Sequence, residues 1–154
     1  MLSLIPLTGI PIVQPGDDLG ALIAASLTPS GVAPLDDSDI LVITQKVVSR
    51  AENRFVDLRT VQPSKRALEL AARTNKDARA VEVMLWDTAE VVRVGPRVIV
   101  VRHRLGFTCA NAGVDASNVA EPGAEMVLRL PDDPDRSARR IRARLRELTD
   151  AAPA

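Results

Sequence analysis

The sequence has few of the residue types on which many metal and redox sites depend. It holds one cysteine and one histidine in 154 residues. A single cysteine cannot form an internal disulfide, which makes a reducing compartment the default, and we expect a cytoplasmic protein. The same count excludes a structural zinc site, because such sites take four ligands that are usually cysteine or histidine. Any metal ion should therefore be a hard cation held by carboxylate and carbonyl oxygens.

Aromatic residues and an excess of charge of either sign are also missing. Aromatics make up 2% of the chain, with no tyrosine, so the sets of rings that stack nucleic-acid bases are nearly excluded. The 20 basic and 20 acidic residues cancel, which gives no electrostatic attraction to nucleic acid or to an anionic membrane. No apolar run approaches the roughly 20 residues that cross a bilayer, and prolines interrupt the apolar start of the chain. We expect neither a nucleic-acid partner nor a membrane partner.

The residues that are present predict an α+β fold, a mixed sheet with flanking helices. Helical and strand patterns do not alternate strictly, which favours this class over a doubly wound sheet. The segment "ILVIT", 40–44, is an aliphatic run typical of a strand buried on both faces. Asp17 or Asp18 should begin the first helix, and Asp133 followed by Pro134 the last. The expected strands are 2–7, 40–44, 54–58, 90–94, 97–104 and 124–130, and the expected helices are 19–27, 64–75, 77–89 and 131–148.

The stretch "GFTCANAGVDASNV", 106–119, is rich in small and polar residues and follows a predicted strand. One interpretation is a surface loop, in which glycine and asparagine serve turns. The other is a ligand loop, in which small residues let a ligand approach the backbone. In that case Asp115 offers a carboxylate to a hard cation and Asn118 an amide to a polar ligand. Cys109 fits a small packing residue better than a nucleophile.

Two further segments have a functional and a plain interpretation. The segment "TGIPIV", 8–13, is either a connector or a loop whose backbone recognises a ligand. In "TQKVVSR", 44–50, Lys46 and Arg50 are four residues apart and share one face if the segment is helical. They could hold phosphates, since ligands often bind after a buried strand, or they could form a solvated basic face. No Walker A loop, dinucleotide fingerprint or nucleophile elbow is present, so the residues alone name no reaction.

Five segments together resemble a known family. They are "PLTGIPIVQPGDDL", "DSDILVITQKVVSRAENRFVDL", "SKRALELA", "HRLGFTCANAGVDASNV" and "LPDDPDRSARRIRARLREL", in this order. They are similar to the N-terminal portion of the coenzyme F420:L-glutamate ligase family, also called F420-0 gamma-glutamyl ligase, over nearly the whole of residues 1–154. The resemblance implies the family's α+β fold, truncated before its second half, and a homodimer. It also implies a GTP-dependent ligase that adds L-glutamate to coenzyme F420-0 through an acyl phosphate, with Mg²⁺ or Mn²⁺ and K⁺.

The resemblance also implies site residues, although it names no catalytic residue. Residues Ile10, Pro11, Ile12 and Val13 fall on a GTP-contacting loop. Gln45, Arg50 and Asn118 fall on further nucleotide contacts, and Gln45 replaces a small hydroxyl residue found in some members. Asp115 matches a metal-binding aspartate. Under this interpretation the stretch 106–119 is kept small so that phosphates and a cation can come close.

The chain departs from the family at its end. Members continue into a strand with an "SDTFGR"-like motif and a further segment that supplies the remaining acidic metal ligands. One carboxylate with waters holds Mg²⁺ weakly. We therefore expect this chain to be inactive by itself and to need a C-terminal half. The alternatives are a non-catalytic nucleotide-binding or assembly module derived from the family, and a structural subunit that only dimerises.

Overall fold

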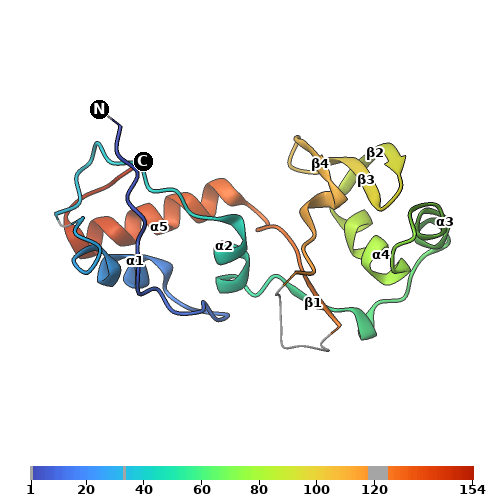
Figure 1. Cartoon of the computed structure of the whole chain (residues 1–154), viewed down its shortest axis with the longest axis horizontal. Coiled ribbons are helices and arrows are strands. Elements are labelled where there is room, and N and C mark those ends of the chain that lie inside the picture. The colour runs from blue at the N-terminus through green and yellow to red at the C-terminus, as the bar shows by residue number, and fades with distance from the viewer. Residues whose placement is uncertain (1, 33, 118–124) are drawn as a thin grey trace. The chain divides into compact units, whose positions relative to one another are not determined.

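The computed structural model describes residues 2–32, 34–117 and 125–154 and divides the chain into two compact units (Figure 1). Unit 1 combines both ends of the chain, Met1–Asn53 and Pro131–Ala154. Unit 2 is the continuous segment Arg54–Leu130. The α+β class is confirmed, because helices in both units accompany small antiparallel sheets in unit 2.

The described residues of unit 1 form three helices: α1 (Leu19–Leu27), α2 (Gln45–Ala51) and α5 (Pro134–Thr149). Asp18 begins α1, since its Oδ1 accepts a hydrogen bond from the Ala21 amide at 3.1 Å. Asp133 begins α5 in the same way, and Pro134 occupies the first helical position, as predicted. The apolar stripes of the helices then pack into one core. Its buried members are Val13, Leu19, Ile23, Val48, Ile141 and Leu145.

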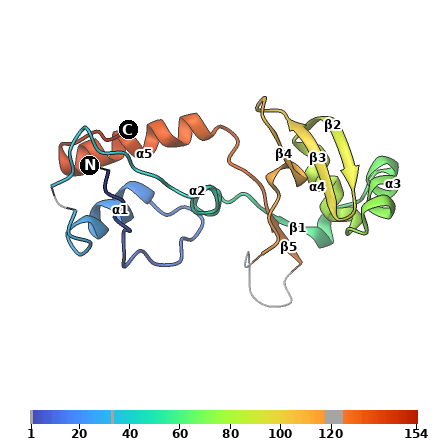
Figure 2. The same cartoon turned by 45° about the horizontal axis from the view of Figure 1, so that its top comes forward.

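Unit 2 packs two helices, α3 (Lys65–Thr74) and α4 (Ala78–Trp86), against a three-stranded antiparallel sheet (Figures 1 and 2). The sheet has the order β2 (Thr88–Gly95), β3 (Val98–His103), β4 (Thr108–Ala110). β2 and β3 form the predicted hairpin, in which Val94 lies opposite Ile99. The core between helices and sheet includes Leu70, Val81, Ile99, Val101 and Ala112.

A second, two-stranded sheet of unit 2 joins residues far apart in the sequence. β1 (Phe55–Asp57) pairs antiparallel with β5 (Met126–Leu128), with Val56 opposite Val127. Two 3₁₀ turns, Leu58–Thr60 and Asn111–Gly113, complete the elements of the described residues.

Two of the predicted strands are wrong. Residues 2–7 and 40–44 lie in unit 1 and form neither strand nor helix. The prediction that 40–44 is buried on both faces is also wrong, because Ile40 is 74% and Val42 84% exposed. The short strand β4 was not predicted either, because it lies within the small-residue stretch 106–119.

Candidate functional site

The predicted nucleotide loop and Arg50 lie together in unit 1. The Nε of Arg50 donates a hydrogen bond to the carbonyl oxygen of Val13 at 2.8 Å. A second bond, from the Gly16 amide to the Ala51 carbonyl at 2.8 Å, joins the same loop to the end of α2. Val13 is buried in the core of unit 1. The structure therefore brings together two of the positions that the sequence analysis assigns to GTP.

The other three residues of the loop, Ile10, Pro11 and Ile12, are exposed. The Nε2 of Gln14 donates to the Ile12 carbonyl at 3.2 Å, and the Gln14 amide donates to Oδ2 of Asp17 at 2.7 Å. The loop is thus shaped by its own polar groups and presents apolar side chains outward. A surface of this kind can accept a ligand by backbone and apolar contact.

Gln45 begins α2 and is half-buried. Its Nε2 donates to the Oγ of Ser49 at 2.6 Å, one helical turn further on. Arg50 lies near the other end of this seven-residue helix. Gln45 and Arg50 thus belong to the same short helix, and only Arg50 is hydrogen-bonded to the loop 10–13 in the contacts described.

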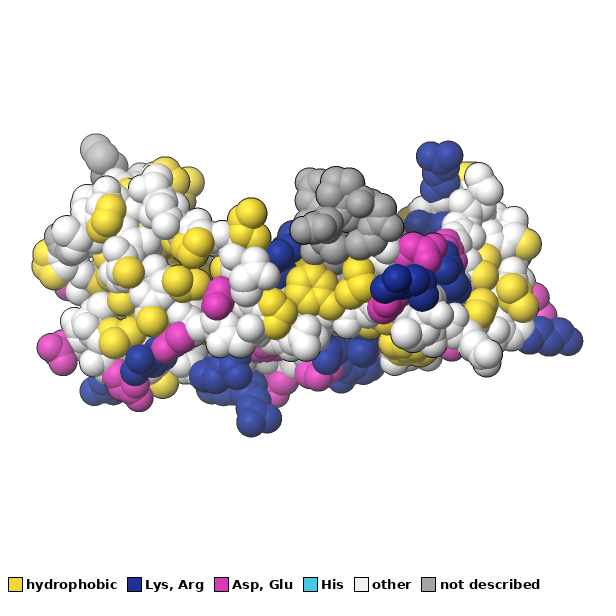
Figure 3. Space-filling view, turned by 90° about the horizontal axis from the view of Figure 1, so that it is seen from below, with side chains coloured by type: hydrophobic (Ala, Val, Ile, Leu, Met, Phe, Trp, Pro, Cys, Tyr) yellow, Lys and Arg dark blue, Asp and Glu magenta, His cyan; other side chains and the backbone are white. Residues whose placement is uncertain are grey.

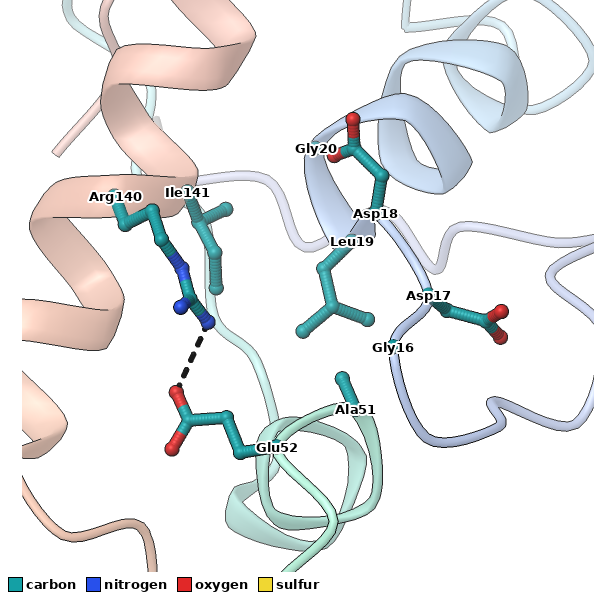
Figure 4. A pocket seen from close by; sticks show the side chains of 9 residues that line it. All are labelled: Gly16, Asp17, Asp18, Leu19, Gly20, Ala51, Glu52, Arg140 and Ile141. Carbon is teal, nitrogen blue, oxygen red and sulfur yellow. Dashed lines mark hydrogen bonds and ion pairs between the residues drawn. The ribbon is translucent and has the colours of Figure 1, made fainter.

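An open hollow of about 250 Å³ lies in unit 1 next to this loop (Figure 4). Its walls come from the start of α1, the end of α2 and the middle of α5, and they carry none of the predicted site residues. Its lining is Gly16, Asp17, Asp18, Leu19, Gly20, Ala51, Glu52, Arg140 and Ile141.

The charged groups of this hollow serve the packing of unit 1. Glu52 accepts hydrogen bonds from the Oγ of Ser137 at 2.5 Å and from Arg140 at 3.1 Å. Asp18 caps α1 and accepts from the Nε of Arg144 at 2.7 Å. The Ala21 amide and the Arg144 guanidinium lower the pKa of Asp18 below its ordinary value. The carboxylates hold helices together, and we assign no ligand to the hollow.

Asp115, the predicted metal ligand, lies in unit 2 beside β5. Its backbone forms a bridge with Leu128, through hydrogen bonds of 2.9 and 2.8 Å. Its Oδ1 accepts from both the amide and the Oγ of Ser117 at 2.7 Å. Asn118, a predicted nucleotide contact, lies outside the described residues. The structure therefore fixes the backbone of Asp115 firmly and leaves its predicted ligand role untested.

Some of the small residues in 106–119 have a packing role that the sequence interpretation did not include. Ala112 is fully buried in the core of unit 2. Gly113 has φ of +69°, and a Cβ atom there would lie 2.6 Å from the Cγ of Leu130. At these two positions packing accounts for the small residue, because neighbouring side chains already occupy the space that a larger residue would need, and the ligand role of the stretch stays a prediction.

The described residues do not make a metal site by themselves. Over 2–32, 34–117 and 125–154, no group of three or more His, Cys, Asp or Glu side chains is placed to hold an ion. Asp115 supplies one carboxylate, and one of its oxygens already accepts two hydrogen bonds. Mg²⁺ and Mn²⁺ need several oxygen ligands. Further ligands for such an ion would have to come from outside this part of the chain.

Sequence reasoning missed a buried ion network in unit 2. The side chain of Asp87, at the end of α4, is 2% exposed. It accepts from Arg129 at 2.7 and 2.9 Å and from the Nε of Arg104 at 2.8 Å. Burial raises the pKa of Asp87, but the hydrogen bonds and charges of the two arginines outweigh it and hold the pKa below its ordinary value. No local pattern could have shown this network, since its members are far apart in the sequence.

His103 lies near this network, and Cys109 lies on β4 against the apolar core of unit 2. His103 is 1% exposed and stacks on Phe107, with ring centroids 4.8 Å apart. Its Nδ1 accepts from the Leu105 amide at 3.1 Å, which places the proton of the neutral ring on Nε2. Burial lowers the pKa of His103 and raises that of the half-buried Cys109 thiol. A protonated thiol is a poor nucleophile, in accord with a packing role for Cys109.

On the face drawn in Figure 3, charges do not gather by sign, because basic and acidic side chains lie intermixed. The net charge is zero. Within the described part of the chain, no helix has both the length and the hydrophobicity that a membrane span requires.

Comparison with known proteins gives a consistent result. A family model described as F420-0:gamma-glutamyl ligase matches residues 9–154. A coenzyme F420:L-glutamate ligase of Methanopyrus kandleri is 52% identical over 136 residues, 88% of this chain and 50% of the relative. Those of Methanothermobacter thermautotrophicus and Archaeoglobus fulgidus are 44% and 39% identical over 148 residues, 96% of this chain and 57% and 55% of theirs. The chain spans about half the length of these curated relatives.

Proposed function

We propose a ligase function for this chain, which belongs to the F420-0:gamma-glutamyl ligase family. Together with a second half like that of its relatives, it joins L-glutamate to coenzyme F420-0 in the biosynthesis of coenzyme F420. The observation that carries this proposal is the family match over residues 9–154, with 52% identity to a protein named as this ligase.

The proposed chemistry activates a carboxylate before the amide forms. A carboxylate oxygen of the precursor attacks the γ-phosphorus of GTP, the bond from that phosphorus to the β-phosphate oxygen breaks, and GDP leaves. The amine of glutamate then attacks the acyl carbon, and inorganic phosphate leaves with the bonding electron pair while the nitrogen loses a proton. Such a reaction depends mainly on positioning and on stabilising phosphate charge.

Within this scheme unit 1 contributes to the nucleotide site. We assign Ile10, Pro11, Ile12 and Val13 to contact with GTP by their loop. The bond between Arg50 and the Val13 carbonyl supports a shared role for loop and helix, since it fixes one against the other at 2.8 Å. Gln45 is a further proposed nucleotide contact of unit 1, and Asn118, in the segment 54–130, is another proposed contact.

Unit 2 contributes Asp115, which we propose as one ligand of Mg²⁺ or Mn²⁺. When bound, such an ion offsets phosphate charge, and K⁺ is a further proposed requirement. Because the described residues supply only part of an oxygen ligand set, we expect the chain to be inactive without the second half. A homodimer and a cytoplasmic location stay predictions.

The experiment joins this chain to the missing half. The second half of the Methanopyrus relative is fused after Ala154, and the extended protein is given GTP, Mn²⁺, coenzyme F420-0 and L-glutamate. We expect a glutamylated product by mass spectrometry and one GDP for each amide formed. Asp115→Asn should lower turnover at least about tenfold, because a neutral amide is a weaker ligand for a hard cation.

Asp36→Asn is the matched control. The Oδ1 of Asp36 accepts from the Ser38 amide at 2.8 Å, the same local turn that Asp115 makes with Ser117. If both variants ligate as fast as the parent, Asp115 has no role at the metal. If the folded parent forms no product and no GDP, the ligase proposal itself is wrong.

One observation favours a second candidate, a non-catalytic nucleotide-binding or assembly module. The part of the chain that the structure describes holds no complete metal-ligand group. Calorimetry of the 154-residue chain with GTP and Mn²⁺ separates the two. Micromolar binding without turnover, in the short and the extended chain alike, is the result expected of such a module.

A further inference from the structure

The segment Asp39–Thr44 of unit 1 has one packed face and one bare face. Leu41 and Ile43 pack against the core that α1, α2 and α5 form. Ile40 is 74% exposed and Val42 84% exposed. This alternation is that of an extended strand, in which successive side chains point to opposite sides. Large aliphatic side chains on both faces are typical of a strand that is covered on both faces.

The edge of this segment already carries the start of a second strand. The Leu41 amide donates to the Ala154 carbonyl at 2.9 Å, and the Ala154 amide donates to the Asp39 carbonyl at 3.0 Å. Ala154 is thus hydrogen-bonded to both chain neighbours of Ile40, Asp39 and Leu41. This is the pattern of a parallel bridge, in which Ile40 lies opposite Ala154. Figures 1 and 2 show the C-terminal end beside the segment that leads to α2.

The backbone that reaches Ala154 is held in this direction. Ala151 and Ala152 are buried, and the Ala152 amide donates to Oδ1 of Asp37 at 2.6 Å. The Nε of Arg142, on α5, donates to the Pro153 carbonyl at 2.9 Å. The residues after α5 therefore run back along 37–41 in a fixed register.

We propose that Asp39–Thr44 is the docking edge for the second half of the family chain. The residues that follow the position of Ala154 in the relatives continue the parallel strand along Leu41–Thr44, and that half covers Ile40 and Val42. We infer this occupant from the length of the relatives, which are about twice as long as the part that this chain matches. The proposal goes beyond the ligase function, since it concerns assembly and can be tested without nucleotide or substrate.

The test measures thiol reactivity at the bare face. Val42→Cys is made in a Cys109→Ala background, in the 154-residue chain and in the chain extended after Ala154 with the second half of the Methanopyrus relative. We expect a maleimide to react with Val42→Cys at least about tenfold more slowly in the extended chain, because the side chain becomes covered. The amide of Ile43, the next amide on the edge that Leu41 uses, should exchange hydrogen more slowly as well.

Leu68→Cys is the matched control. Leu68 is an aliphatic side chain of α3 in unit 2, 53% exposed, and its reactivity should be equal in the two chains. Equal reactivity of Val42→Cys in the two chains would overturn the proposal. So would protection of Val42→Cys in the short chain that grows with protein concentration, because a second copy would then be the occupant. Aggregation of the extended chain under conditions where the short chain stays folded also counts against it.

Each of these readings is independent of ligation. A protected Val42→Cys in a protein that forms no amide would leave the docking edge standing and remove the proposed function. An active extended protein in which Val42→Cys reacts as fast as in the short chain would support the proposed function and overturn the docking edge.

Discussion

Asp87 stabilises unit 2 by neutralising two arginines from different elements. Arg104 follows β3, Arg129 follows β5, and both donate to the same buried carboxylate. The backbone adds to this, since the Arg104 amide donates to the Asp87 carbonyl at 2.8 Å. A carboxylate that is 2% exposed is stable in its charged form only because its partners are present.

We expect Asp87→Asn to lower the free energy of unfolding by about 3 kcal/mol, because it leaves two guanidinium groups without their buried partner. Urea denaturation followed by circular dichroism measures this. Glu90→Gln is the control, since Glu90 pairs with Arg102 at 3.3 Å while both side chains are more than half exposed. That change should cost less than about 1 kcal/mol. Equal effects would mean that the buried network contributes no more than a surface pair.

His103 should make the stability of unit 2 depend on pH. Burial lowers its pKa below the ordinary 6.5, and the charges of Arg104 and Arg129 act in the same direction while that of Asp87 opposes them. The unfolded chain therefore binds more protons than the folded one as the pH falls below 6.5. Stability is fully present above that pH and is lost below it, by at most about 1.4 kcal/mol for each pH unit.

Urea midpoints at pH 7.5 and 5.5 test this prediction. The parent should be less stable at the lower pH, and His103→Gln should lose most of the difference, because glutamine does not titrate. A slope that is the same in the variant would assign the pH dependence to other groups. Asp87 is one such group, but its lowered pKa makes it titrate below 3.8, outside this window.

For single residues, the sequence could predict the structural role where the partner is close along the chain, and could not where the partner is distant. The caps Asp18 and Asp133 follow from their neighbours along the chain, because a helix start is satisfied within three residues. Asp87 and Arg129 are 42 residues apart, and no pattern in the sequence relates them. Asp115 was singled out as a carboxylate in a small-residue loop and again through the family resemblance, and its predicted role in metal binding stays a prediction.

The turn Asn111–Gly113 shows how an element is built from residues that allow close packing. Asn111 and Ala112 have φ of +53° and +51°, and the Oδ1 of Asn111 accepts from the Ile99 amide at 3.1 Å. Gly113 lies directly against Leu130. The turn thereby joins the sheet of β2–β4 to the segment after β5 within unit 2.

Gly113→Ala should destabilise unit 2 for two reasons. A left-handed backbone costs a residue with a Cβ about 1–2 kcal/mol, and the contact at 2.6 Å from Leu130 adds about 1–3 kcal/mol of overpacking. Thermal or urea unfolding measures the sum. The matched control is Gly106→Ala, with φ of +93° and nothing within 4 Å of the added Cβ, which should show the backbone cost alone.

A double-mutant cycle separates the two costs. In a Leu130→Ala background, Gly113→Ala should be milder than in the parent, with a coupling of at least about 1 kcal/mol. If the two changes are additive, the close approach of Gly113 to Leu130 costs nothing and only the backbone conformation matters.

Periodic patterns in the sequence predicted whether a segment is a helix or a strand better than they predicted which strands pair. The helices α1, α3, α4 and α5 and the hairpin β2–β3 agree with the sequence patterns. The run 40–44 was wrong as a strand, although its inward residues pack as a strand's would. A hydrophobic pattern predicts which side chains are buried, but it does not predict which other segment buries them.

For the whole molecule, the order of the motifs identified the family, and the comparisons confirm it. The division into two units was not predicted, because it depends on which distant segments pack together. α5 lies at the far end of the chain from α1, yet the Arg144 guanidinium donates to Asp18 at 2.7 Å, and Ile141 and Leu145 complete the core of unit 1. Such pairing of the two ends is a property of the packed structure.

This discontinuity has a consequence for how the protein emerges from the ribosome. Residues 1–53 are translated before unit 2, but the helix that closes their core is translated after the whole of unit 2. A nascent chain can complete unit 2 while the apolar faces of α1 and α2 still lack Ile141 and Leu145. Because segments tend to fold as they emerge, unit 2 should reach its native structure before unit 1, despite following it in the message.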